Sequence, residues 1–386
     1  GNDSAVFRMR LYAGNKSKYL EYAYSLKGEG YLLNLKVNAV GLQDVIASNT
    51  SDMTLHWEMR TPSQEKSAEN ERAASTVYFK YLEDEVDYLS ETSDEKKSLE
   101  AKVKWISFKQ NFLTSVLIAD NAFEKPTDVE TRAITNSKKY VKAFTANLTI
   151  PYHHEAVESF GMKFYFGPNH YETLKEVGFD LEEQIPLGWG ILGWVNRFIV
   201  IPIFNFLDGF NLNYGIIILI LTLIIKALLF PIAYKTYLSS AKMRILKPEV
   251  DEINKKHGKE DPLKKQQAMM ALYKKAGVNP LAGCIPLLLQ MPILIALFKF
   301  FPASIELRQQ AFLWADDLST YDSIYNFSFN IPFYGDHVSL FTLLMTISTI
   351  LYTYSNSQLM GSTEQMPGMK MMMYLMPVMF LGIFNN

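Results

Sequence analysis

The spacing of apolar residues divides the chain near residue 185. Before that point, short runs of alternating apolar and polar residues have the period of two that is typical of β-strands. Polar segments separate these runs, and no strand–helix–strand rhythm connects them. We therefore predict an all-β domain over residues 1–185, folded as an antiparallel sandwich, with a short helix and connector at its end. The clearest strand-like runs are residues 5–13, 30–40, 53–61, 75–83, 101–110, 140–150 and 162–168.

After residue 185 the apolar residues gather into long runs. A single run of this kind fits the core helix of a soluble protein as well as a membrane span, but four in one chain favour spans. We predict an α-helical transmembrane bundle over residues 186–386. The four predicted spans are residues 214–234, 284–301, 338–354 and 369–384.

Residues 189–209 form a further apolar stretch, which Asn196, Arg197 and Pro202 interrupt. A spanning helix here would place the β domain on the same side of the membrane as the loop after residue 234. An interfacial helix would leave the β domain on the opposite side. The polar interruptions favour a helix with one wet face, and Trp189 and Trp194 suit the membrane interface. We prefer the interfacial interpretation.

The loops orient the predicted spans. Residues 235–281 carry six more basic than acidic side chains, which predicts a cytoplasmic location. Their pattern predicts a helical hairpin, apolar inside and basic outside. The hairpin is either a solvated linker with charges near the membrane surface or a docking surface for an anionic partner or a ribosome. The candidate docking residues are Lys242, Arg244, Lys255, Lys256, Lys264 and Lys265.

The loop over residues 302–337 is acidic and is expected on the outer side, together with the β domain. In a bacterium this arrangement means an inner-membrane protein with a periplasmic N-terminal domain.

Composition and motifs exclude several classes of function. The net charge of −2 gives no basic field for specific nucleic-acid recognition, and Cys284, the single cysteine, excludes an internal disulfide. We find no phosphate-binding loop and no hydrolase or metalloprotease motif, so we expect neither an enzyme nor a cofactor. Adjacent His153 and His154 would point to opposite faces of a strand, which makes a metal site improbable.

Lys226 lies inside the first predicted span. An ammonium at the centre of a membrane costs about 2.5–3.5 kcal/mol on insertion scales. The four spans contain no Asp or Glu that could pair with it. Thr222 precedes it by four residues and therefore shares its helical face. We infer that water reaches this lysine through a hydrated pocket, which would serve as a substrate groove.

Further polar or adaptable residues in the other spans are candidates for the same groove. Threonines in spans also form helix–helix hydrogen bonds, and methionines also fill gaps in helix bundles, so both interpretations stay open. The candidates are Gln290 in the second span, Thr346 and Thr349 in the third, and Met371 and Met372 in the fourth.

Three segments resemble the bacterial branch of the YidC/Oxa/Alb family of membrane protein insertases. These are "AKMRILKPEVDEINKKHG", "MMALYKKAGVNPLAGCIPLLLQMPILIALF" and "SIELRQQAFLWADDLS". The resemblance implies five core spans after an N-terminal anchor, and a groove open to cytoplasm and lipid but closed toward the periplasm. Thr222 and Lys226 match the family's threonine and groove cation, although the common bacterial cation is arginine.

The resemblance also implies a function without nucleotide hydrolysis, with nascent membrane proteins as substrates. The implied partners are the ribosome, the Sec translocon and membrane lipids, which the hairpin and the groove would contact. The anchor and the fifth core span are expected outside the given sequence. Two rival interpretations remain: a secondary transporter or channel in which Lys226 binds a small anion, and an outward-facing binding module on a membrane anchor.

Overall fold

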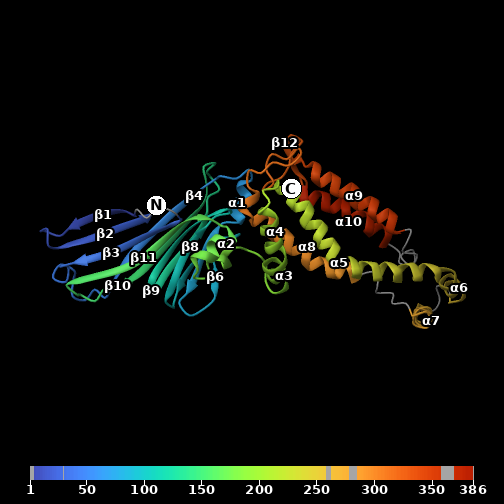
Figure 1. Ribbon diagram of the computed structural model, residues 1–386, viewed down its shortest axis with the longest axis horizontal. Coiled ribbons are helices and arrows are strands. Elements are labelled where there is room, and N and C mark those ends of the chain that lie inside the picture. The colour runs from blue at the N-terminus through green and yellow to red at the C-terminus, as the bar shows by residue number, and fades with distance from the viewer. Residues whose placement is uncertain (1–3, 29, 258–261, 278–284, 358–368, 386) are drawn as a thin grey trace. The chain divides into compact units, whose positions relative to one another are not determined.

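The structure is a computed structural model that describes residues 4–28, 30–257, 262–277, 285–357 and 369–385 (Figure 1). The chain separates into two compact units. One contains Gly1–Pro186 together with Ala303–Glu306, and we call it the β unit. The other contains Leu187–Pro302 and Leu307–Asn386, and we call it the helical unit. The first segment of the β unit ends at Pro186, next to the boundary predicted at residue 185.

The β unit is an antiparallel sandwich, as predicted. Its longer sheet has the strand order β1-β2-β3-β11-β9-β8-β5-β6, while β4, β10 and β7 form a second sheet with the other half of β9. The strands are β1 (Ser4–Tyr12), β2 (Tyr19–Lys27), β3 (Leu32–Val40), β4 (Asp52–Pro62), β5 (Thr76–Tyr81), β6 (Val86–Tyr88), β7 (Glu95–Leu99), β8 (Val103–Lys109), β9 (Leu113–Ala133), β10 (Tyr140–Pro151) and β11 (Val157–Pro168).

Aromatic side chains from both sheets meet in the core of the sandwich. Trp57 of β4 stacks on Phe108 of β8 with ring centroids 3.8 Å apart, and Phe144 of β10 lies 5.5 Å from the same ring. Trp105 and Phe144 have no exposed surface. Burying rings of this size removes large apolar areas from water, which is the main favourable contribution to folding a sandwich.

Some elements of the β unit were not predicted. The pattern missed β2, and it missed β9, the longest strand. The polar segment before residue 75 was not expected to be helical, whereas the short helix α1 (Ala68–Ala73) forms there. Residues 116–119 of β9 are apolar and buried on both faces, so they show no alternation.

The connector at the end of the β unit is confirmed as a short helix, α2 (Tyr171–Val177), followed by the 3₁₀ turn η1 (Leu181–Gln184). The His170 side chain caps α2 by accepting from the Thr173 N–H group. The Trp105 indole donates to the Phe179 carbonyl oxygen at 2.8 Å. This bond fixes the connector against the core of the sandwich.

The helical unit contains helices where the apolar runs predict them. The segment predicted over 189–209 is one continuous helical stretch of α3, a π-helical turn and α4. Its elements are α3 (Ile191–Val195), η2 (Asn196–Val200), α4 (Ile201–Asp208), α5 (Tyr214–Ile245), α6 (Lys247–His257), α7 (Pro262–Lys275), α8 (Ile285–Ala303), η4 (Ile305–Leu307), β12 (Tyr325–Ile331), β13 (Gly335–Val338), α9 (Leu340–Ser357) and α10 (Met369–Asn385).

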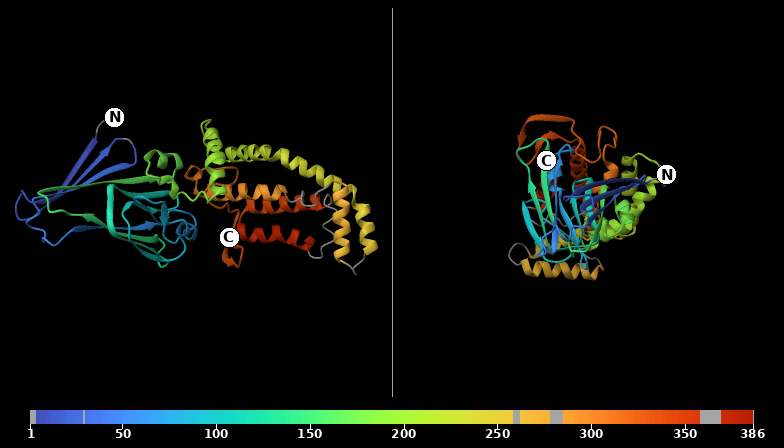
Figure 2. Two further views of the ribbon diagram at one scale, coloured as in Figure 1. Left: turned by 90° about the horizontal axis from the view of Figure 1, so that it is seen from below. Right: turned by 90° about the vertical axis from the view of Figure 1, so that its left-hand side faces the viewer.

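Helix α5 is longer than the apolar run that predicted it. It has 32 residues and continues past Tyr234 to Ile245, well beyond the apolar stretch (Figure 2). Residues 235–245 contain no glycine or proline, and Ala241, Lys242 and Met243 are good helix formers, so nothing in the sequence ends the helix there. The first hairpin helix consequently begins only at Lys247.

The π turn fastens the predicted interfacial helix to α8. Asn196 in this turn is completely buried, and its amide donates to the carbonyl oxygens of Leu187, at 2.7 Å, and Ala296, at 2.9 Å. The Phe204 ring of α4 lies 5.3 Å from the Phe300 ring of α8. A buried polar group is stabilising only when it is bonded, so the Asn196 amide specifies this packing.

The loop between α8 and α9 is organised by Asp322. Its carboxylate accepts from the Trp314 indole at 2.8 Å, from the Ser339 hydroxyl, and from the backbone N–H groups of Leu340 and Phe341. Burial raises the pKa of Asp322, but these bonds outweigh burial and hold the pKa below its ordinary value. The carboxylate thereby stabilises the N-terminus of α9.

Candidate functional site

Lys226 lies on the exposed side of α5. Ile217, Leu221 and Ile225 form the buried stripe of this helix at intervals of four residues. Lys226 is exposed, and at 100° per residue it lies about 100–180° around the helix from that stripe. Among the residues that the structure describes, no hydrogen bond or ion pair joins its ammonium to another group.

The N-terminal end of the same helix face is covered by the loop after α8. The Phe312 ring packs against Gly215, where an added Cβ would lie 2.1 Å from the ring. The Asn213 amide donates to the Ala311 carbonyl oxygen at 2.9 Å and fixes the loop in place. Only a residue without a side chain permits this contact. Lys226 follows Gly215 by eleven residues, or about 16 Å along the helix.

The predicted groove threonines all bond within their own helices. The hydroxyl of Thr222 donates to the Ile218 carbonyl oxygen at 2.8 Å, and that of Thr346 to the Thr342 carbonyl oxygen at 2.9 Å. Thr349 bonds the Met345 carbonyl oxygen at 2.7 Å. Hydroxyls satisfied in this way can face an apolar environment at little cost.

The remaining groove candidates lie on two helices, α8 and α10. Gln290 of α8 is half-buried, whereas Met371 and Met372 of α10 are exposed. Helix α10 packs against α9, and the Phe298 ring of α8 lies 6.0 Å from the Phe384 ring of α10. The structure therefore connects the helices that carry Gln290, Thr346 and Met371, whereas the described contacts of α5 are chiefly with α4 and α6.

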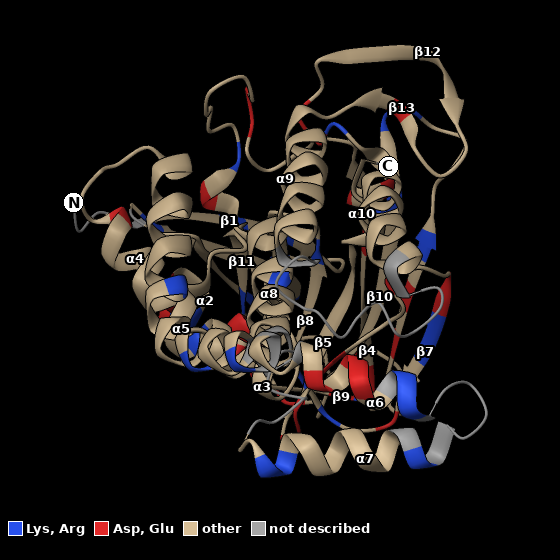
Figure 3. Ribbon diagram, turned by 90° about the vertical axis from the view of Figure 1, so that its right-hand side faces the viewer, with Lys and Arg blue, Asp and Glu red and all other residues tan. Residues whose placement is uncertain are grey.

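The predicted basic hairpin is helical, with α6 packed against α7. Figure 3 shows basic residues at the ends of α7. Val250 and Tyr273 are buried, while Lys242, Lys255, Lys256 and Lys264 are exposed. The side chains of Arg244 and Lys265 lie outside the described residues, as does Cys284.

Comparison with known families identifies both units. A family model described as "YidC periplasmic domain" matches residues 1–206, and one described as "60Kd inner membrane protein" matches residues 206–386. The chain belongs to the YidC family. Similar proteins named membrane protein insertase YidC occur in Parabacteroides distasonis and Bacteroides fragilis, each 45% identical over 100% of this chain. The relative in Porphyromonas gingivalis is 44% identical, also over 100% of this chain. The chain spans 63% of the length of the first two and 64% of the third.

The apolar helices of this YidC family member differ in length, and two of them are as long as a membrane span requires. Among the described residues, Ile191–Asp208 and Tyr214–Ser239 are long and apolar enough to cross a bilayer. Only 17% of the second stretch is buried, whereas the core helix of a soluble protein is mostly buried. Leu288–Ala303, Leu340–Ser355 and Met371–Asn385 are shorter apolar stretches.

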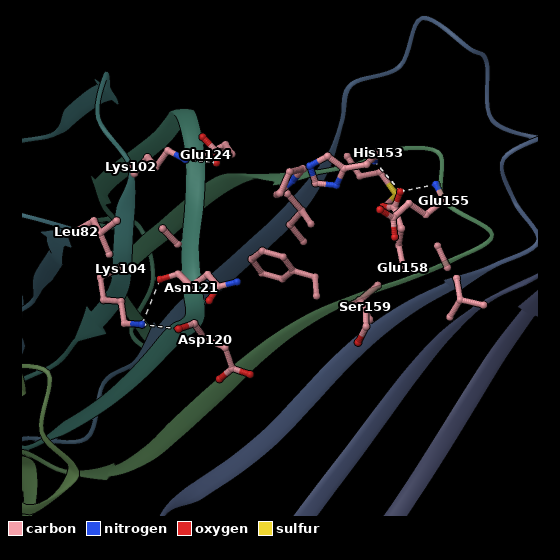
Figure 4. Close-up of a pocket in the computed structure, with 18 residues that line it drawn as sticks. Leu82, Lys102, Lys104, Asp120, Asn121, Glu124, His153, Glu155, Glu158 and Ser159 are labelled. Atoms are coloured by element: carbon pink, nitrogen blue, oxygen red, sulfur yellow. Dashed lines mark hydrogen bonds and ion pairs between the residues drawn. The ribbon is translucent and has the colours of Figure 1, made fainter.

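The half of the chain that matches the YidC periplasmic domain contains a cavity of about 710 Å³ (Figure 4). It lies where β9 passes from one sheet to the other, between Asp120 and Glu124. Strand β11 pairs with β9 only over Met162–Pro168, so the two strands separate toward the cavity. The apolar part of the cavity is lined by Val37, Ala39, Met53, Ile150 and Phe160, among others.

Charged groups lie at two ends of the cavity (Figure 4). At one end, the Lys104 ammonium donates to the backbone carbonyl oxygens of Asp120 and Asn121, at 2.7 and 3.2 Å. Burial lowers the pKa of Lys104. At the other end, the Glu158 carboxylate accepts the backbone N–H groups of His153 and Glu155, at 2.7 and 2.8 Å.

The two adjacent histidines have separate surroundings. His153 lines the cavity, while the His154 ring donates to the Thr50 carbonyl oxygen at 2.7 Å and packs on Tyr152. Among the residues with described positions, no group of three or more His, Cys, Asp or Glu side chains could hold a metal ion.

Sequence reasoning missed the cavity and the contact of Phe312 with Gly215. The cavity depends on the separation of β9 and β11, which no local pattern shows. Gly215 at the start of an apolar helix was a usable signal, because a glycine in such a helix often marks a close approach by another group.

Proposed function

We propose that this chain forms most of a membrane protein insertase, which moves nascent membrane proteins from the cytoplasm into the inner membrane. Its membership of the YidC family supports this proposal, as do the insertase names of its relatives. The observation that carries the mechanism is the exposed ammonium of Lys226, without a described partner, in a long apolar helix.

In the proposed topology, α5, α8, α9 and α10 cross the membrane and the α3–α4 segment lies in the interface. The β unit is then periplasmic, and the basic hairpin of α6 and α7 is cytoplasmic. With Gly215 at the outer boundary, Lys226 lies near the middle of a hydrocarbon layer about 30 Å thick. A charge at this depth is tolerated where water reaches it, which supports a hydrated groove.

The proposed groove is closed on the periplasmic side by Phe312, which covers the Lys226 face of α5 at Gly215. Toward the cytoplasm that face continues as Thr222, Lys226 and Phe230, all of them exposed. A substrate therefore enters from the cytoplasmic side. The Lys226 ammonium attracts the polar, often acidic, tail of the substrate and lowers the cost of moving it part-way across.

The apolar segment of the substrate then moves into lipid, driven by its own burial at about 25 cal/mol per Å² of apolar surface. Exposed Met371 and Met372 would contact segments of varied shape, because methionine is flexible and polarizable. The protein lowers only the energy barrier to moving the polar tail of the substrate, so insertion consumes no nucleotide. The hairpin lysines would contact the ribosome or the Sec translocon during this step.

The test measures insertion of a single-span substrate with an acidic tail into proteoliposomes that contain the full-length protein. Lys226→Arg should retain activity, Lys226→Ala should lower it, and Lys226→Glu should lower it by at least about tenfold, which corresponds to about 1.4 kcal/mol in the barrier. Lys299→Glu is the matched control, because Lys299 lies near the outer end of α8, where its charge can reach water.

Equal activity of the Lys226→Glu and Lys226→Arg variants would refute the electrostatic role. Saturable uptake of chloride or phosphate by the same vesicles, lost in Lys226→Ala, would instead support an anion transporter.

A further inference from the structure

Strand β12 of the loop between α8 and α9 has two faces of different chemistry. Tyr325, Phe327 and Phe329 alternate with Asn326, Ser328 and Asn330. The aromatic rings contact one another along the strand: Tyr325 and Phe327 meet edge to face with centroids 5.3 Å apart, and Phe327 and Phe329 are tilted with centroids 5.6 Å apart. One face of the strand is therefore aromatic, and the other carries amides and a hydroxyl.

The aromatic face is largely uncovered by the rest of the protein. Tyr325 is 62% exposed and Phe329 61% exposed, and Phe333 in the turn after β12 is 91% exposed. Residues 325–335 contain no charged side chain, and β12 has no acidic or basic residue in Figure 3. A group of exposed aromatic rings of this kind marks an interaction surface.

We propose that this aromatic face lies in the headgroup layer of the outer membrane leaflet and binds zwitterionic lipid. The inference rests on the proposed topology, in which α9 and α10 span the membrane. Aromatic side chains favour this layer, because their rings are apolar and their edges are polar. The opposite face of amides and a hydroxyl can bond water and phosphate, and the absence of Lys and Arg gives no preference for anionic lipid.

The position of the hairpin supports this occupant. Strand β13 ends at Val338, and α9 begins two residues later at Leu340. Helix α9 has 18 residues and is therefore about 27 Å long, close to the thickness of the hydrocarbon layer. Its first residue thus lies at the interface, and the hairpin joined to it begins at headgroup depth.

The other end of the hairpin is fixed to α10. The Phe333 carbonyl oxygen packs closely against Gly382 of α10. A Cβ atom added to Gly382 would lie only 2.6 Å from this oxygen, so a residue with a side chain would not fit there. The Asn385 amide donates to the carbonyl oxygens of Tyr334 and His337, each at 2.7 Å. Both ends of the ribbon are therefore held at the ends of membrane helices. On the same helix, close to Gly382, Ile383 and Met379 are also exposed.

The experiment places a fluorescent label on each face of β12. In full-length protein with every native cysteine, Cys284 included, changed to serine, Phe329→Cys or its neighbour Ser328→Cys is labelled with nitrobenzoxadiazole. The protein is reconstituted in phosphatidylcholine nanodiscs that contain a lipid with a headgroup spin label. Quenching at residue 329 should exceed that at residue 328 by roughly threefold, because only one face meets the headgroups. Both positions are exposed, so neither cysteine disturbs the packed core.

Equal quenching at the two positions would overturn the proposal. So would blue-shifted emission at residue 329 without quenching, since this would show that protein covers the face. A label at Ile347→Cys, exposed in the middle of α9, tests the topology separately with a spin label on the acyl chain. Quenching at residue 347 without quenching at residue 329 rejects the hairpin proposal alone. Absence of quenching at residue 347 rejects the membrane topology as well.

Discussion

In the β unit Trp105 and Phe144 have no exposed surface, whereas Leu223 of α5 in the helical unit is 68% exposed. Both units are rich in apolar residues. The sandwich core encloses large aromatic rings completely, whereas α5 buries only one narrow stripe and leaves most of its apolar side chains exposed. The polar group of interest on this helix, Lys226, is also exposed. The comparison teaches that the two units expose different surfaces, and the exposed apolar face of α5 suits the lipid environment of the proposed topology.

The largest expected effect is a loss of stability when a buried apolar side chain of the β unit is shortened, compared with an exposed one of α5. Phe144→Ala removes a ring from the core and should lower the free energy of unfolding of the β unit by roughly 3–5 kcal/mol. Leu223→Ala is the matched change on α5 and should alter stability by less than about 1 kcal/mol, because no protein packs around most of this side chain. Urea unfolding of the full chain in detergent, followed by tryptophan fluorescence, measures both. Comparable losses would show that the exposed face of α5 is covered by protein.

The next largest effect is expected at Asp322, the buried carboxylate at the start of α9 in the helical unit. Asp322→Asn weakens four hydrogen bonds to a charged acceptor and should cost about 1.5–3 kcal/mol locally. The amides of Leu340 and Phe341 should then exchange their hydrogens faster, which mass spectrometry of the peptide over residues 339–345 measures. Exposed Asp316, changed to Asn, is the control. Unchanged exchange in the Asp322 variant would contradict the role of this carboxylate at the start of α9.

The β unit should respond to pH through two buried lysines. Burial lowers the pKa of Lys109 and of Lys142 from 10.5 to about 8. Between about pH 8 and pH 9.5 the folded unit has released protons that the unfolded chain still holds, so stability should rise with pH. The slope should be on the order of 1 kcal/mol per pH unit for each lysine.

Substituting Lys109 separates its contribution to the pH dependence of stability from that of the other titratable groups. Lys109→Met should reduce the slope, whereas Lys102→Met on the surface should not. Burial raises the pKa of Tyr78 and of Tyr165, so these tyrosines make stability fall as the pH rises. Their effect begins only above about pH 10, where tyrosine in the unfolded chain loses its proton. A slope unchanged by Lys109→Met, in urea unfolding at several pH values, would argue against this assignment.

The smallest effect concerns the threonines in the helical unit. Thr346→Val removes a hydroxyl that bonds only to its own helix and to no other side chain in the described structure. The change in thermal stability should stay below about 1 kcal/mol, because the Thr342 carbonyl oxygen keeps its helical hydrogen bond. A larger loss would show that Thr346 has a polar partner, as a wet groove in the bundle would provide.

Local patterns predicted the elements of the structure better than their contacts. Alternation identified β3, β4 and β10, and apolar length identified α5, α8, α9 and α10. The pattern missed β9, in which residues 116–119 are buried on both faces, and the long extension of α5, which contains no glycine or proline. Lys226 was found because a charge stands out in an apolar run, while the Phe312 contact joins residues nearly one hundred positions apart and leaves no local trace.

The long strand β9 affects how the β unit responds to a mechanical force. Its first half completes one sheet and its second half completes the other, so neither sheet can separate without breaking hydrogen bonds of the same strand. A pulling force on either sheet is therefore transmitted along a single backbone to its partner. Both sheets should rupture together, in one force peak, when the domain is stretched.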